Sequence, residues 1–167
     1  QSSADKERET SVCHPSIVDR ARDNAEVDVA CGKCAGTTGG PSDDGATYDG
    51  VAPFGEGDIL DWNPDYWQRV HDYLELAASR GVTAFLYPID GWTIGNAFSP
   101  NSERSCEEFG ARVAEYFADL PNIVWVIGGD FTPKQEDQWV VAKMAEAIQA
   151  EDSTHLITGH GSPEHSA

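Results

Sequence analysis

Two aspartates each follow an apolar segment of strand length. Residues 123–127 lead through two glycines to Asp130, and residues 82–87 lead through a proline to Asp90. In parallel α/β folds the carboxyl ends of the strands carry the catalytic groups. The two side chains therefore predict an acid/base site at one edge of a sheet. A helix N-cap or turn role for either aspartate alone remains an alternative.

The segments around these aspartates alternate between strand and helix patterns. Asn63 and Pro64 fit the cap and first position of a helix that Gly81 ends. Apolar residues at helical spacing predict two more helices, and a short helix is also predicted near the N-terminus. The further helices cover 15–22, 102–120 and 135–150, and the strands cover 26–30, 82–87, 123–127 and 156–158.

This alternation predicts an α/β fold with a parallel sheet. A doubly wound sheet would carry a glycine fingerprint after its first strand, but residues 31–36 do not have that spacing and no P-loop sequence is present. A (β/α)8 barrel is therefore the better match. Because a complete barrel needs roughly 200–250 residues, the strands predict a partial (β/α)8 TIM-type barrel, about half of one.

The composition is that of a folded and strongly acidic chain. Of its 167 residues 40% are hydrophobic, and 29 acidic against 11 basic residues give a formal net charge of −18. This charge disfavours nucleic acid and anionic membrane as partners and favours a neutral sugar, a cation or a basic partner. We expect a polar N-terminal segment over 1–25, a barrel-like domain over 26–167, and a secreted or extracellular protein. Because the first residue is Gln, the chain is expected to be a processed, tagged or excised piece.

Four cysteines leave three interpretations open. Cys31 and Cys34 have the C-x-x-C spacing that supplies half of a tetrahedral zinc site, and Cys13 with His14 could supply the rest. A redox pair would need a helix start after a strand, but the residues after Cys34 are typical of a loop. A disulfide between Cys13 and Cys31 or Cys34 is favoured, with Cys106 free and buried on its helix face.

The long polar connection over 31–61 also carries acidic residues. Asp43, Asp44 and Asp49, with Asp58 and Asp61 beyond them, could offer oxygen ligands to calcium. Their spacing does not follow the EF-hand pattern. A solvated acidic loop is therefore favoured, and we expect no bound metal.

Residues 26–161 resemble the apiosidase-like glycoside hydrolases, a barrel family related to the retaining (β/α)8 hydrolases. The resemblance depends on several short motifs at strand ends and helix starts. They are VDVAC at 27–31, YDGVAPF at 48–54, NPDYW at 63–67, AASRGV at 77–82, PIDGW at 88–92, LPNIVW at 120–125, GGD at 128–130 and LITGH at 156–160. Against that family, strand 26–30 would be the second barrel strand and strand 156–158 the fifth.

The resemblance implies a glycoside hydrolase that acts on polysaccharide by a retaining mechanism, with Asp130 as general acid/base and a carbohydrate as substrate. A glycosidic oxygen is a poor leaving group and needs a proton from a carboxylic acid. Asp90, Trp92, Trp125 and His160 would contact the sugar or wall the site. Core packing for either tryptophan, a turn role for Asp90 and a loop role for His160 remain alternatives. We expect no cofactor.

Retention needs a second carboxylate about 5 to 5.5 Å from the first, and in this family that group lies on the seventh strand. The sequence does not contain that strand. We therefore expect a fragment, a barrel completed by self-association or by a missing C-terminal half, or a non-catalytic carbohydrate- or metal-binding module. Four strands would leave an open inward face, for which the candidates are Val27, Val29, Phe85 and Val124 or Trp125.

Overall fold

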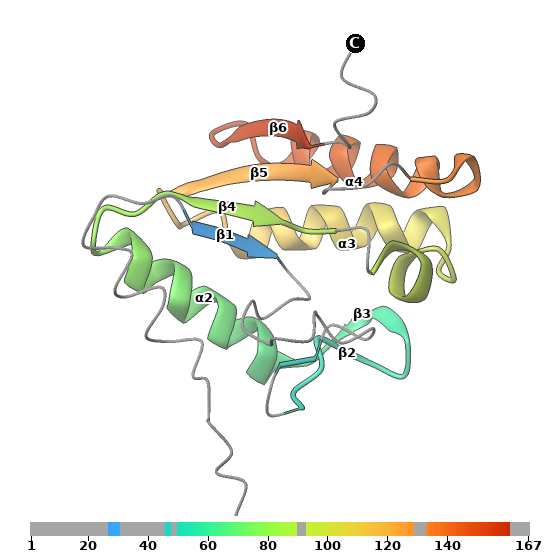
Figure 1. Ribbon diagram of the computed structural model, residues 1–167, viewed down its shortest axis with the longest axis horizontal. Helices are drawn as coiled ribbons and strands as arrows, with labels where there is room; N and C mark the ends of the chain where they lie inside the picture. The colour runs from blue at the N-terminus through green and yellow to red at the C-terminus, as the bar shows by residue number, and fades with distance from the viewer. Residues whose placement is uncertain (1–26, 31–45, 48–49, 90–92, 129–132, 161–167) are drawn as a thin grey trace, which may run out of the picture.

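A computed structural model describes residues 27–30, 46–47, 50–89, 93–128 and 133–160. Over these residues the chain forms a four-stranded parallel sheet with helices packed along it (Figure 1). This is the partial (β/α)8 TIM-type barrel predicted from the sequence. Among the described residues, no helix is both long and apolar enough to cross a membrane.

The sheet has the strand order β1-β4-β5-β6, and each neighbouring pair is parallel. Its strands are β1 (Val27–Ala30), β4 (Ala84–Tyr87), β5 (Ile123–Gly128) and β6 (Leu156–His160). All four were predicted, with bounds close to those observed. Because the strands run the same way, their carboxyl ends lie at one edge of the sheet (Figure 1).

The described residues contain three α-helices: α2 (Pro64–Ala78), α3 (Glu103–Tyr116) and α4 (Gln138–Glu151). The side chain of Asn63 caps α2 by accepting from the backbone N of Asp65 at 3.1 Å, as the sequence predicted. The helix predicted over 102–120 ends earlier, at Tyr116, and the start of the third is a 3-10 turn, η3 (Gln135–Asp137). The helix predicted over 15–22 lies outside the described residues.

The connection predicted over 31–61 contains a β-hairpin that the sequence patterns did not reveal. Its strands, β2 (Phe54–Gly55) and β3 (Asp58–Trp62), are antiparallel. Between them Glu56 and Gly57 have φ of 45° and 81°, the positive values of a tight hairpin turn. The hairpin is held to α3 by Arg112, whose Nη1 donates to the carbonyl of Leu60 at 2.8 Å. A single π-helical turn, η2 (Ile94–Phe98), precedes α3.

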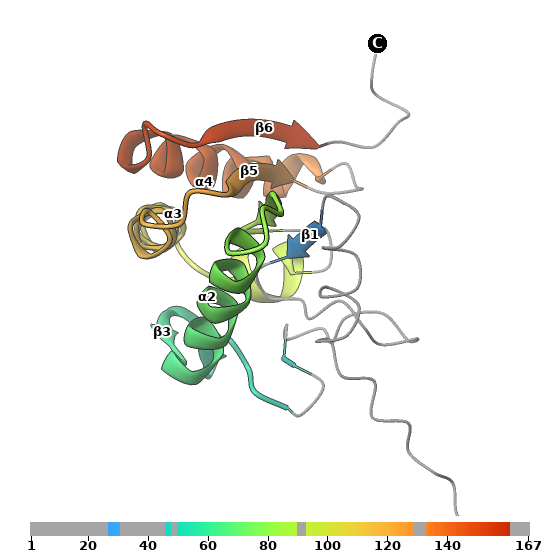
Figure 2. The same cartoon turned by 90° about the vertical axis from the view of Figure 1, so that its left-hand side faces the viewer.

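The three α-helices lie on one face of the four-stranded sheet (Figure 2). Ala84 and Leu86 of β4 and Ile123, Trp125 and Ile127 of β5 belong to the core formed with the helices, and the ring centroids of Trp125 and Phe117 are 6.4 Å apart. Val126 of β5, on the other face, is also buried. On the opposite face Phe85, Val124 and Leu156 pair in one row, and Leu156 is 67% exposed. Of the residues predicted for the open inward face, Phe85 and Val124 therefore lie away from the helices, whereas Trp125 lies against them. The side chains of Val27 and Val29 are outside the described part.

Candidate functional site

The carboxyl-terminal edge of the sheet is where the predicted acid/base site would be. β4 ends at Tyr87, three residues before Asp90, and β5 ends at Gly128, two residues before Asp130. β4 and β5 are neighbours in the sheet. The chain therefore runs toward both aspartates from the same edge. Asp90, Asp130 and Trp92 themselves lie outside the described residues.

His160 is the last residue of β6 and pairs in register with Gly128 at the end of β5. This pairing puts the backbone of His160 beside the point from which the chain leaves β5 toward Asp130. The side chain of His160 is outside the described part. Its contact with a sugar stays a prediction.

Trp125 occupies a different place from the one the resemblance implied. Its side chain is 0% exposed, and its Nε1 donates to Oδ2 of Asp152 at 2.7 Å. A sugar stacks on an exposed aromatic face, and this ring presents none. In the structure Trp125 is a core residue, the alternative that the sequence also allowed.

Two residues near the same edge were not singled out from the sequence. Tyr87 ends β4, alternates with the buried Leu86 and is half-buried on the face that holds Phe85. Thr158 alternates with Ile157 in β6 and is exposed. The two-residue period of a strand, counted back from its carboxyl end, is the signal that would have identified them.

A buried ionisable pair lies at the opposite, amino-terminal edge of the sheet. Oδ2 of Asp152 lies 2.6 Å from Nδ1 of His155, and Nε2 of that ring donates to the carbonyl of Leu120 at 2.7 Å. Burial alone would raise the pKa of Asp152, but hydrogen bonds from Trp125, His155 and Thr154 outweigh it and hold the pKa well below its usual range. Both partners of the imidazole, Oδ2 of Asp152 and the carbonyl oxygen of Leu120, are acceptors. The pair ties α4 to the turn before β5.

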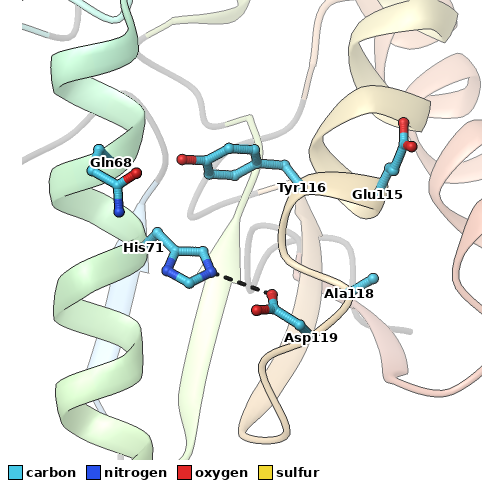
Figure 3. A pocket seen from close by; sticks show the side chains of 6 residues that line it. All are labelled: Gln68, His71, Glu115, Tyr116, Ala118 and Asp119. Atoms are coloured by element: carbon cyan, nitrogen blue, oxygen red, sulfur yellow. Dashed lines mark hydrogen bonds and ion pairs between the residues drawn. The ribbon is translucent and has the colours of Figure 1, made fainter.

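A pocket lies on the helical side of the sheet, between α2 and the turn after α3 (Figure 3). Its volume is about 380 Å3, and Nε2 of His71 donates to Oδ1 of Asp119 at 3.2 Å across it. Burial, with the charges of Asp72 and Asp119, raises the pKa of Tyr116. The lining residues are Gln68, His71, Glu115, Tyr116, Ala118 and Asp119. Since Asp119 precedes β5, this pocket is separate from the carboxyl-terminal edge.

The cysteine and acidic-loop predictions are only partly within the described residues. Cys106 is free and 0% exposed, as predicted, and burial raises the pKa of its thiol to about 11. Cys13, Cys31 and Cys34 lie outside the described part, as do Asp43, Asp44 and Asp49. Asp58 and Asp61 are exposed, and Oδ1 of Asp58 accepts from the backbone N of Leu60 at 2.9 Å, a turn contact.

Two solved structures share this fold over most of the chain. A glycoside hydrolase family 5 protein from Bacteroides vulgatus ATCC 8482 is 26% identical, with a TM-score of 0.69, over 88% of this chain and 31% of its own. A second structure, described as a glycoside hydrolase, is 21% identical with a TM-score of 0.68, and the match covers 88% of this chain and 32% of its own. The chain thus spans about a third of the length of these structures.

No curated protein matches the chain in sequence. The family model for the apiosidase-like catalytic domain does match, over residues 36–167. That range includes three of the four sheet strands and every described helix. The chain belongs to the apiosidase-like family, and residues 36–167 match its catalytic domain.

Proposed function

We propose that this chain is part of a glycoside hydrolase that cleaves O-glycosidic bonds of polysaccharides with retention of configuration, and that Asp130 is its general acid/base. The observation that carries the proposal is the direction of β5. That strand ends at Gly128 on the carboxyl-terminal edge of the sheet, and Asp130 follows two residues later. In barrel enzymes the catalytic groups are found at this edge.

The chemistry assigned to Asp130 has two steps. Asp130 first gives its proton to the glycosidic oxygen while a second carboxylate attacks the anomeric carbon, so that the alcohol leaves and a glycosyl-enzyme forms. Asp130, now a carboxylate, then takes a proton from the water that displaces the enzyme from the sugar. The nucleophilic carboxylate would come from a part of the barrel that this chain does not contain.

Residues at the same edge are assigned to sugar binding. Asp90 and His160 would hydrogen-bond hydroxyl groups, and Trp92 would wall the site or stack on a sugar ring. Tyr87 and Thr158 join this set because they lie near the ends of their strands, on the face away from the helices. A net charge of −18 suits a neutral sugar better than an anionic ligand. A polysaccharide substrate would also agree with the expectation that the protein is secreted.

Azide rescue in the intact protein that contains this chain tests the proposal. With an activated aryl glycoside, Asp130→Ala should still form the glycosyl-enzyme but hydrolyse it slowly, because water lacks its base. Azide is a nucleophile that needs no base, so it should restore turnover and yield a glycosyl azide. The matched control is Asp65→Ala, which removes an exposed aspartate at the start of α2.

The same experiment distinguishes a hydrolase from a non-catalytic carbohydrate-binding module. Substrate binding without hydrolysis in the unmodified intact protein would favour a non-catalytic carbohydrate-binding module. Hydrolysis that Asp130→Ala leaves unchanged would remove Asp130 from the mechanism.

A further inference from the structure

The pocket between α2 and the turn after α3 is lined by His71, which belongs to a group of side chains that could hold a metal ion. His71, Asp72 and Glu75 each offer one ligand atom, and these atoms lie within 4.8 Å of one another. His71 and Glu75 are one helical turn apart and so share a face of α2. Imidazole nitrogen and carboxylate oxygen are both atoms that Zn²⁺ binds.

The imidazole of His71 is held in one orientation by its neighbours. It stacks on Phe117 with ring centroids 6.0 Å apart and planes 15° apart, and meets the edge of Tyr116 at 5.7 Å. Its Nε2 donates to Oδ1 of Asp119 at 3.2 Å. A ring that is neutral and donates from Nε2 has its lone pair on Nδ1, and Figure 3 shows this second nitrogen on the side away from Asp119.

The contact with Asp119 does not involve the carboxylates on α2, and it is of the kind that orients metal-binding histidines. Histidines that bind metals almost always donate their other ring N–H to a carboxylate, a carbonyl or water, which selects the tautomer and orients the ring. Asp119 comes from a different segment, the turn that leads into β5, and makes this contact with His71. Its contact therefore matches the second layer of a metal site.

The local charge favours a cation. Glu115 and Asp119 line the pocket itself. The side chains of Asp72 and Glu75 are exposed, so each can rotate to shorten its distance to a shared ion. Around a tetrahedral ion with bonds of about 2.0–2.2 Å, ligand atoms are roughly 3.3–3.6 Å apart.

We propose that His71, Asp72 and Glu75 bind a divalent transition-metal ion of the zinc type, with water completing its coordination and Asp119 acting as a positioning residue. The site lies on the helical side of the sheet, whereas the proposed hydrolytic site lies at the carboxyl-terminal edge. The proposal is therefore independent of the proposed function.

Calorimetric titration with Zn²⁺ alone tests this site. The intact protein is used, with accessible thiols alkylated so that Cys31 and Cys34 do not contribute. We expect one zinc equivalent that His71→Gln and Glu75→Gln each weaken at least tenfold. The control, Glu151→Gln, removes an exposed carboxylate at the end of α4 and should leave affinity within about twofold.

Asp119 is tested by a pair of variants. Asp119→Asn should weaken zinc binding by about 10- to 100-fold, the usual effect of losing the carboxylate behind a metal-bound histidine. Asp119→Glu keeps the charge and should recover part of that affinity. A role in packing alone would change the melting temperature of the metal-free protein and leave zinc affinity as it was.

The result that overturns the proposal is equal zinc affinity and stoichiometry in the unmodified protein, His71→Gln and Glu75→Gln. Absence of the zinc equivalent from the unmodified protein overturns it as well. Circular dichroism establishes that each variant is folded. If His71→Gln does not fold, Glu75→Gln and Asp72→Asn decide, because both positions are exposed.

Discussion

Gly128 pairs in register with His160 where β5 and β6 end, and its φ of 99° is one that residues with a side chain rarely adopt. The chain leaves β5 through this glycine and reaches Asp130 two residues later. The positive φ of Gly128 is therefore the last described backbone turn before the proposed acid/base.

Gly128→Ala should consequently reduce activity of the intact protein. A Cβ at this φ is strained by about 1 kcal/mol or more, and relief of that strain would move Asp130. We expect kcat/KM to fall by at least tenfold. Gly81→Ala is the matched control, because Gly81 also has positive φ, 71°, but lies three residues after the end of α2 at Ala78. It should lower stability and leave kcat/KM unchanged, and an equal loss of activity in both variants would contradict the role of Gly128.

The lowered pKa of Asp152 predicts a loss of stability in acid. The pKa of Asp152 is lower in the folded chain than in an unfolded one, so its stabilisation is present above the unfolded value of about 3.9 and disappears as pH falls through the folded value. Asp152→Asn should reduce the free energy of unfolding at pH 7 by about 3 kcal/mol. The difference in the free energy of unfolding between Asp152→Asn and the unmodified protein should become smaller below about pH 4.

Denaturant unfolding between pH 7 and pH 3 measures this effect. Asp65→Asn is the control, since Asp65 is exposed and should change the free energy of unfolding by no more than about 0.5 kcal/mol. A loss in Asp152→Asn that stays constant across the whole pH range would show that the carboxylate charge is not what stabilises the fold.

The contact between α3 and α4 depends on the absence of a side chain at Gly110. A Cβ there would lie 2.9 Å from Cβ of Ala147 and 3.1 Å from the carbonyl oxygen of Met144. Gly110→Ala should therefore destabilise the fold by about 1–3 kcal/mol, as overpacking does. Gly95→Ala is the control, because a Cβ there would meet nothing within 4 Å. Thermal unfolding compares them, and equal melting temperatures would contradict the close packing.

Much of the fold could be predicted because local signals agreed with the tertiary structure. Asn63 and Pro64 begin α2 as their chemistry requires, and the apolar strand patterns recur as the strands of one sheet. The hairpin β2–β3 could not be predicted from periodicity. β2 has only two residues, and the turn at Glu56 and Gly57 carries one glycine and one residue that rarely takes positive φ.

The candidate site was only partly accessible to sequence reasoning. The strand ends could be predicted, because an apolar strand pattern followed by an aspartate can be recognised in the sequence alone. The environment of Trp125 could not be predicted. The face on which its side chain lies depends on how β5 pairs with β4 and on its hydrogen bond to Asp152, at the C-terminus of α4. The contact of His71 with Asp119 joins positions 48 residues apart and has no local sequence signal.

The row of Phe85, Val124 and Leu156 predicts that the 167-residue chain alone exposes apolar surface. Leu156 is 67% exposed on the face away from the helices. We expect the isolated chain to bind the apolar dye ANS or to self-associate in light scattering, and Leu156→Ser to weaken either signal. A compact monomer that unfolds cooperatively and binds no dye would show that this face is already covered.

The most direct test of the central claim is the dependence of Asp130→Asn on the leaving group. In the intact protein the variant should lose at least ~10² in turnover on substrates with poor leaving groups, because acid catalysis is worth about 10²–10⁴. An activated aryl glycoside needs little protonation, so its glycosylation step should lose much less. Equal losses on both kinds of substrate would contradict the assignment of Asp130 as the general acid and indicate a structural role.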